Sequence, residues 1–127
     1  MDDAAGAILI VDDHSESRVV LRAYLEHHGR RVYEAPDGEA CLAVARSERP
    51  DLIVLDLLLP VLDGWRTAEA LRRDPTTEAI PILALTATSR PEQHERALKA
   101  GCDVVVMKPV RPAVLLSEIE ALLARTS

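Results

Sequence analysis

The chain has 127 residues, which is the usual size of one domain and too short for two. Hydrophobic residues make up 48% and charged residues 28%, which excludes a disordered tract, and the formal net charge of −6 argues against direct nucleic-acid binding. No apolar run approaches the roughly 18 residues that span a bilayer and no secretory signal pattern begins the chain, so we expect a cytoplasmic protein that does not contact the membrane.

Short apolar runs alternate with longer amphipathic runs along the chain. In chain order, the sequence predicts strand 7–11, helix 15–28, strand 31–34, helix 37–47, strand 52–55, helix 64–73, strand 82–85, helix 90–100, strand 104–106 and helix 111–125. Most of the strand runs are continuously apolar instead of alternating, which indicates strands buried on both faces of a parallel sheet. We therefore expect an α/β fold with a single doubly wound five-stranded parallel sheet flanked by five helices. Residues 1–6 are predicted to be a flexible N-terminus, and residues 7–127 the domain.

Helix boundaries carry recognisable signals. Ser15 is a candidate N-cap of the first helix, and Gly29 is a good stop for it. Pro91 and Pro112 lie at plausible first helical positions, and Gly101 comes just after the end of the fourth helix. Cys41 and Cys102 are far apart without the spacing of metal ligands, so we expect two reduced thiols.

Polar residues follow the carboxyl ends of four predicted strands, where open α/β sheets bind their ligands. These residues are Asp12 and Asp13, Asp56, Thr86, and Lys108. Crowded carboxylates repel one another, and a divalent cation relieves that repulsion. Mg²⁺ prefers a few carboxylates together with waters and a phosphate oxygen. A hydroxyl and a mobile cation suit a phosphoryl group placed on the central carboxylate.

Each of these residues has an ordinary explanation when taken alone. An Asp after a strand is most often a turn or cap residue, and an acidic pair before a helix can serve the helix dipole. A single lysine usually lies on the surface. His14 can be drawn as a metal ligand, although an exposed position at the mouth of the crevice is the commoner outcome. The functional interpretation depends on all the polar groups sharing one side of the sheet.

Several short motifs occur together in one order and spacing. They are IVDD at 10–13 with Arg18 beyond it, PDLIVLD at 50–56, Pro60 followed by DG at 63–64, PILALTA at 81–87, and AGCD at 100–103 leading to KP at 108–109. With these motifs the chain resembles the receiver domain of two-component response regulators, of the single-domain chemotaxis-regulator type, from about residue 8 to residue 125. The resemblance implies a flavodoxin-like fold with strand order 2-1-3-4-5.

The resemblance also implies a role for individual residues. Asp56 would be the phospho-acceptor, Asp13 and Asp56 direct Mg²⁺ ligands, Asp12 a ligand through water, and the backbone carbonyl of Leu58 a further ligand. Thr86 would be the hydroxyl that moves to the phosphoryl group.

Further implications concern the remaining motif and the partners. Lys108 would pair with the phosphoryl group, and the bond before Pro109 would be cis. A histidine kinase or histidine phosphotransfer protein would supply the phosphoryl group. The chain would catalyse only its own phosphorylation and dephosphorylation. A downstream protein would bind the face formed by helix 90–100, strand 104–106 and helix 111–125.

Two positions depart from the family pattern. The family usually places an aromatic residue three positions before the lysine, and here that position is Val105. Valine cannot swing a ring inward, so we expect activation to pass through the loop after Thr86 and helix 90–100. Leu58 is apolar and cannot orient an attacking water, which predicts a long-lived phosphoryl group.

Other functions stay open from the sequence. A Mg²⁺-dependent phosphatase of the haloacid dehalogenase type also phosphorylates an Asp after a strand, but such enzymes need a second Asp two residues on, where this chain has Leu58. A degenerate receiver used only for docking or dimerisation is opposed by the intact set of five polar residues. A fragment of a longer hybrid kinase is a third alternative.

Overall fold

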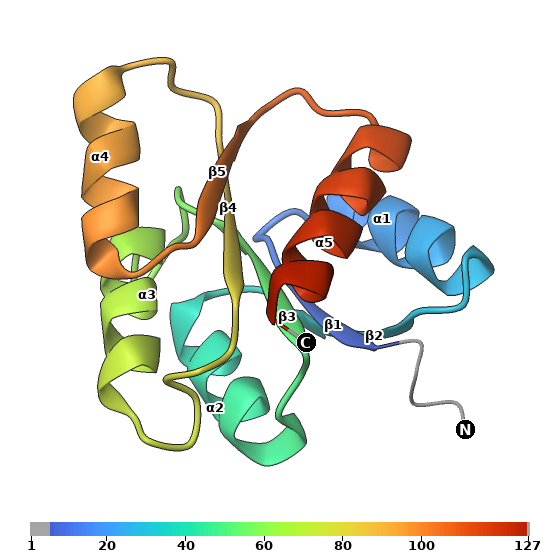
Figure 1. Ribbon diagram of the computed structural model, residues 1–127, viewed down its shortest axis with the longest axis horizontal. Helices are drawn as coiled ribbons and strands as arrows, with labels where there is room; N and C mark the ends of the chain where they lie inside the picture. Colours follow the sequence, from blue (N-terminus) through green and yellow to red (C-terminus); the bar gives the residue numbers. More distant parts are fainter. Residues whose placement is uncertain (1–5, 127) are drawn as a thin grey trace.

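The computed structural model describes residues 6–126, in which strands and helices alternate (Figure 1). The elements are β1 Ala7–Val11, α1 Ser15–His27, β2 Arg31–Ala35, α2 Gly38–Glu48, β3 Leu52–Asp56, α3 Gly64–Arg73, β4 Ile82–Thr86, α4 Pro91–Ala100, β5 Val104–Met107 and α5 Pro112–Thr126. All ten elements predicted from the sequence are present, and no boundary differs by more than one residue.

The strands form one parallel sheet in the order β2-β1-β3-β4-β5, which confirms the predicted fold class and strand order. Every residue of β3 and β4 is buried, as their continuous apolar sequences predict. Alternate residues of β3 point to opposite faces, so Ile53 and Leu55 join one core cluster while Leu52 and Val54 join the other.

Two helical layers cover the sheet. Helices α2, α3 and α4 lie on one face and supply small and aliphatic residues such as Cys41, Ala68 and Ala97 to its core. Helices α1 and α5 lie on the other face and contribute Leu25 and Ile119 (Figure 1). The core holds almost no aromatic side chain, so its stability rests on branched aliphatic residues, each worth about 1.5–3 kcal/mol when fully buried.

The N-terminus of α1 differs from the prediction. Ser15 is the first helical residue and not the N-cap, which is His14 in extended conformation without a side-chain cap. The reason is that Asp12 makes the turn instead, since its Oδ1 accepts a hydrogen bond of 2.8 Å from the backbone N–H of His14. Pro91 at the start of α4 and Gly101 at its C-cap, with φ 116°, agree with their predicted roles.

The predicted flexible segment 1–6 lies outside the described residues except for Gly6, whose carbonyl accepts a hydrogen bond of 3.3 Å from the Arg31 N–H. Among residues 6–126, no helix combines the length and apolar character that a bilayer crossing requires.

Candidate functional site

Strand register brings the predicted polar residues to one edge of the sheet. Val11 pairs with Leu55, so Asp12 and Asp56 follow at the ends of neighbouring strands. Asp56 pairs with Leu85, and Thr86 comes next on β4. Thr86 in turn pairs with Met107, and Lys108 follows directly. The shared edge that the functional interpretation requires is therefore present.

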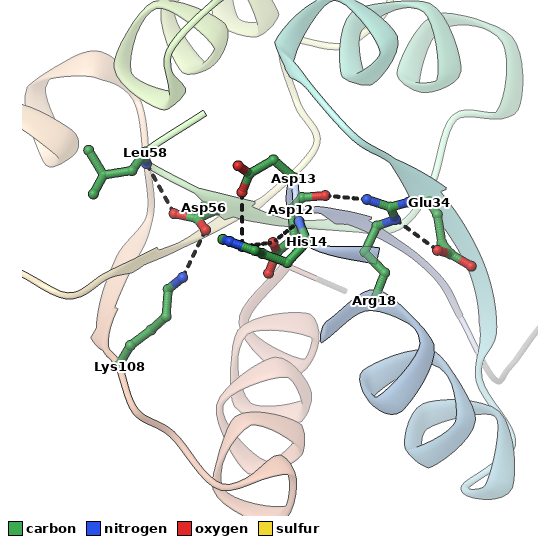
Figure 2. A network of polar contacts seen from close by, with 8 residues as sticks. All are labelled: Asp12, Asp13, His14, Arg18, Glu34, Asp56, Leu58 and Lys108. Carbon is green, nitrogen blue, oxygen red and sulfur yellow. Dashed lines mark hydrogen bonds and ion pairs between the residues drawn. The ribbon is translucent and has the colours of Figure 1, made fainter. Parts of the chain in front are cut away.

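Asp56 is a buried carboxylate with a defined orientation. It is only 3% exposed. Its Oδ2 accepts a hydrogen bond of 2.8 Å from Lys108 Nζ, and its Oδ1 accepts one of 3.0 Å from the Leu58 backbone N–H (Figure 2). These two donors compensate the cost of burying a negative charge. The arrangement holds one carboxylate at the end of the central strand, ready to react.

Gly64 explains the DG motif in physical terms. Asp63 is the N-cap of α3, and its side chain accepts a hydrogen bond from Arg66 N–H. The next residue lies so close to β3 that a Cβ on Gly64 would be 2.5 Å from Leu57 Cα and 2.7 Å from the Asp56 carbonyl oxygen. Only glycine permits this approach, which holds the start of α3 against Asp56, the last residue of β3, and Leu57, the residue after it.

Asp12, Asp13 and His14 form an acidic group at the end of β1. One ligand atom from each lies within 4.8 Å of the others. The His14 Nδ1 is 3.1 Å from Asp13 Oδ1 and 3.4 Å from Asp12 Oδ1, and the two carboxylates are 35% and 13% exposed. Two partly exposed carboxylates with their oxygens free for further ligands are the donor set that Mg²⁺ accepts, so the residues present fit this ion.

Asp56 does not belong to that close group. The sequence predicted that three carboxylates would meet in one crevice. Asp56 follows a strand next to that of Asp12, but it is not part of the group whose ligand atoms all lie within 4.8 Å of one another. Both of its oxygens are bonded, one to Lys108 and one to the Leu58 N–H. His14, expected to be a bystander at the mouth of the crevice, faces the acidic pair while staying highly exposed.

Arg18 joins the backbone of the acidic group to a carboxylate on β2. Arg18 of α1 donates from Nη1 to the Asp12 carbonyl at 2.6 Å and from Nε to Glu34 Oε1 at 2.9 Å. The other Glu34 oxygen accepts from Arg22 Nη1 at 2.8 Å. The hydrogen bond from Arg22, aided by that from Arg18, holds the pKa of the Glu34 carboxyl below its usual value, although partial burial opposes the shift.

Glu34 was missed by the sequence reasoning. Arg18 belonged to a motif, but nothing marked an acid on the weakest predicted strand as a neighbour of that arginine. The signal is strand register, since Glu34 pairs with Ile10, two residues before Asp12. Register becomes visible only once the order of the strands is known.

Thr86 connects the edge of the sheet to α4. Its hydroxyl is buried and accepts a hydrogen bond of 3.2 Å from the Thr88 N–H. The Thr88 hydroxyl accepts from Arg90 N–H at 3.2 Å, and the Thr88 carbonyl lies 2.7 Å from His94 Nε2. A short chain of hydrogen bonds therefore runs from Thr86 into the first turn of α4.

The remaining predicted positions lie around this edge. Val105 is a half-buried β5 residue that packs against the core shared with α2, α3 and α4. The Lys108–Pro109 peptide bond is cis. The Leu58 side chain is largely exposed and stands beside Asp56 (Figure 2).

An apolar cavity of about 460 Å³ opens next to these residues. Val20 and Leu21 of α1 and Leu115 of α5 line it, and Asp12 and Lys108 lie at its polar end. The cavity therefore joins an apolar surface of α1 to the polar edge of the sheet.

Comparison with known proteins places these features in context. The family model described as the response regulator receiver domain matches residues 8–120. Protein PilH of Pseudomonas aeruginosa is 36% identical over 117 residues, which is 92% of this chain and 97% of PilH. The transcriptional regulatory protein AfsQ1 of Streptomyces coelicolor is 39% identical over 94% of this chain, which spans only 52%, about half, of AfsQ1.

A solved structure shows a metal in the corresponding fold. The receiver domain of the sensor histidine kinase PA1611 from Pseudomonas aeruginosa superposes with a TM-score of 0.86 at 32% identity, covering 94% of this chain and 98% of that one. In that crystal structure a magnesium ion is coordinated in the active-site cleft.

Proposed function

The chain belongs to the family of response-regulator receiver domains, and on that premise we propose that it is a signalling switch phosphorylated on Asp56. The observation that carries the proposal is the state of this carboxylate. Asp56 is almost fully buried at the end of the central strand, and Lys108 and the Leu58 N–H each bond one of its oxygens and so orient it. No comparable carboxylate lies at another strand end among the described residues.

The phosphoryl transfer follows from these contacts. One Asp56 oxygen attacks the phosphorus of a phosphohistidine whose other ring nitrogen is protonated; the P–O bond forms as the P–N bond breaks, and the imidazole leaves as the neutral ring. Lys108 Nζ, 2.8 Å from Oδ2, can then pair with a phosphoryl oxygen while staying near Asp56. The protein supplies position and charge neutralisation, which is most of what this transfer needs.

Mg²⁺ belongs to the same proposal. Asp13 and Asp56 would bind it directly, Asp12 through water, and the backbone carbonyl of Leu58 would complete the protein ligands. When bound, the ion would neutralise charge on the phosphoryl oxygens. Its support in this chain is the acidic pair, whose carboxylates lie within 4.8 Å of each other beside the His14 ring.

Signal output would pass through α4. When the Thr86 hydroxyl turns to a phosphoryl oxygen, it gives up the Thr88 N–H, and Thr88 is bonded to Arg90 and His94. Val105 has no ring to move. NMR with and without a phosphoryl mimic should show shifts across residues 87–106, and shifts confined to the acidic edge would refute this route.

The partners follow from the surfaces around the site. A histidine kinase or histidine phosphotransfer protein must bring its phosphohistidine to Asp56, so it would cover the apolar cavity whose polar end holds Asp12 and Lys108. A downstream protein would bind the face of α4, β5 and α5, where Leu98 and Met107 are exposed. Both cysteines are free, buried thiols, which suits a cytoplasmic protein without direct nucleic-acid or membrane contact.

Intact-mass analysis tests the proposal. Acetyl phosphate with Mg²⁺ should add one phosphoryl group to the wild-type chain, and a chelator should prevent the addition. Asp56→Asn is the matched control, because it keeps the size and the Leu58 contact of the side chain but removes the nucleophile. An unmodified wild-type chain, or an equally modified Asp56→Asn chain, would refute the assignment.

The alternatives predict other outcomes. A phosphatase of the haloacid dehalogenase type would turn over a generic phosphoester, and a receiver used only for docking or dimerisation would stay unmodified. No observation favours either: Leu58 occupies the place of the second Asp that the phosphatase needs, and the polar set of the edge is complete.

A further inference from the structure

We propose that Arg18, anchored by Glu34, is a positioning residue that sets the affinity of the acidic pair for Mg²⁺. This inference rests on the proposed Mg²⁺ site. Arg18 is not itself a ligand. Its guanidinium binds the backbone of the acidic loop on one side and a carboxylate of β2 on the other (Figure 2).

The first step concerns the backbone of Asp12. Its N–H donates to the Ala35 carbonyl at 3.1 Å, and its own carbonyl accepts from Arg18 Nη1 at 2.6 Å. The peptide groups on both sides of the residue are therefore fixed, one by β2 and one by α1. Because the loop between Val11 and Ser15 has no regular structure, these bonds decide where the carboxylates of Asp12 and Asp13 stand.

The second step concerns what holds Arg18. Its side chain lies in the first turn of α1 and is 16% exposed. Glu34 Oε1 accepts a hydrogen bond from Arg18 Nε, and Nη1 of the same guanidinium is then free to donate to the Asp12 carbonyl. Glu34 is suited to this role because β2 pairs with β1 and because its lowered pKa keeps it charged. The fork of a guanidinium makes both bonds at once, which an ammonium cannot do with the same geometry.

The third step is the consequence for a metal. Two adjacent carboxylates repel each other and would spread apart unless their backbone were held. A dication gains most when its ligands already stand at the spacing that it needs. Residues that orient metal ligands from behind typically change metal affinity by about 10–100-fold when they are replaced. Arg18 and Glu34 stand in that relation to Asp12.

Two effects of Arg18 oppose each other, and this shapes the experiment. Its positive charge repels a dication, while its hydrogen bonds preorganise the ligands. Arg18→Lys keeps the charge and removes the fork, so it isolates the positioning effect. Glu34→Gln keeps Arg18 but weakens its anchor. Arg46→Gln is the control, because Arg46 of α2 forms its ion pair with Asp74 at the C-cap of α3 and not with Glu34 or the acidic loop.

Isothermal titration of the full chain with Mg²⁺ tests the inference. We expect Arg18→Lys and Glu34→Gln each to raise the Kd by about 10-fold or more, and the double variant to be no weaker than the weaker single variant. Arg46→Gln should stay within about 2-fold of wild type, since a distant exposed charge is largely screened. Urea unfolding without Mg²⁺ supplies the second readout, because it measures stability separately from metal affinity.

The outcomes separate the two proposals. An Arg18→Lys chain that binds Mg²⁺ as tightly as wild type overturns the inference and leaves the proposed function intact. A lower stoichiometry with an unchanged Kd means partial unfolding and also overturns it. A wild-type chain without Mg²⁺ binding overturns both. A Kd shift of equal size in Arg46→Gln would reduce the effect to general charge and overturn the positioning role.

Discussion

Val61 stores backbone strain next to the site, and relieving it should stabilise the protein. It lies in the loop between β3 and α3 with φ 69°, in the left-handed region, where a β-branched residue is rare. That conformation costs an L-residue about 1–2 kcal/mol. The side chain is 74% exposed. It therefore buries only a quarter of its surface, which is worth about 0.5 kcal/mol or less.

The strain costs more than the buried surface of Val61 contributes, and this difference predicts how two substitutions change the free energy of unfolding. Asn tolerates left-handed φ, so Val61→Asn should raise the free energy of unfolding by about 1 kcal/mol, or roughly 4 °C in Tm for a chain of this length. Val61→Gly also removes the steric cost but adds about 0.5–1 kcal/mol of chain entropy to the unfolded state, so its gain should be smaller. Val61→Ala keeps the Cβ and should gain nothing.

Urea unfolding of these variants provides the assay, with Val114→Asn as the control. Val114 is also an exposed valine, but it lies in helix α5, where Asn relieves no strain and loses apolar contact. The expected order of stability is Val61→Asn, Val61→Gly, wild type, Val61→Ala. If Val61→Asn and Val61→Gly are both less stable than wild type, the strain at this position is absent and the reasoning is refuted.

Three further predictions concern residues around the same edge. Leu58→Asn should speed the decay of phosphorylated Asp56 by about 10-fold, because the amide can make one hydrogen bond to the attacking water. Mass spectrometry at successive times measures the decay, and an unchanged half-life contradicts the prediction. Gly64→Ala should lower the free energy of unfolding by about 2–3 kcal/mol, because its Cβ would overlap Leu57, and wild-type stability in urea would contradict the close approach. Glu34 has a pKa lowered below 4.5, so its stabilisation is present above that pH and is lost as pH falls through the folded-state pKa. The stability difference between wild type and Glu34→Gln should therefore stay constant near neutral pH and shrink as pH falls below about 4.5, and a difference that grows on acidification would contradict the prediction.

The fold was predictable because its signals are local. Continuous apolar runs such as that of β3 mark buried parallel strands, and Pro91 and Gly101 mark both ends of α4. The N-cap of α1 was predicted wrongly. Ser15 has a suitable side chain, but it is already the first helical residue, and the Asp12 side chain makes the turn before it.

The site was predictable only in part. Its residues follow strand ends, so their shared edge could be inferred from the sequence together with the expected strand order. Their pairing could not, because Lys108 reaches Asp56 across a distance of 52 residues in the chain. The same holds for Glu34, which meets Arg18 through the register of β2 on β1. Tertiary contacts of this kind leave no periodic trace in the sequence.

The two halves of the site are held in different ways, and the difference fits the proposed chemistry. Asp56 is buried and bonded at both oxygens, so the proposed nucleophile is oriented before any donor arrives. Asp12 and Asp13 are partly exposed, and only the backbone of Asp12 is clamped. Ligands that must take up and release a hydrated ion benefit from open side chains on a fixed backbone, whereas a nucleophile benefits from the opposite. A rigid acceptor beside an open acidic pair is therefore the arrangement that a reversible, metal-dependent switch requires.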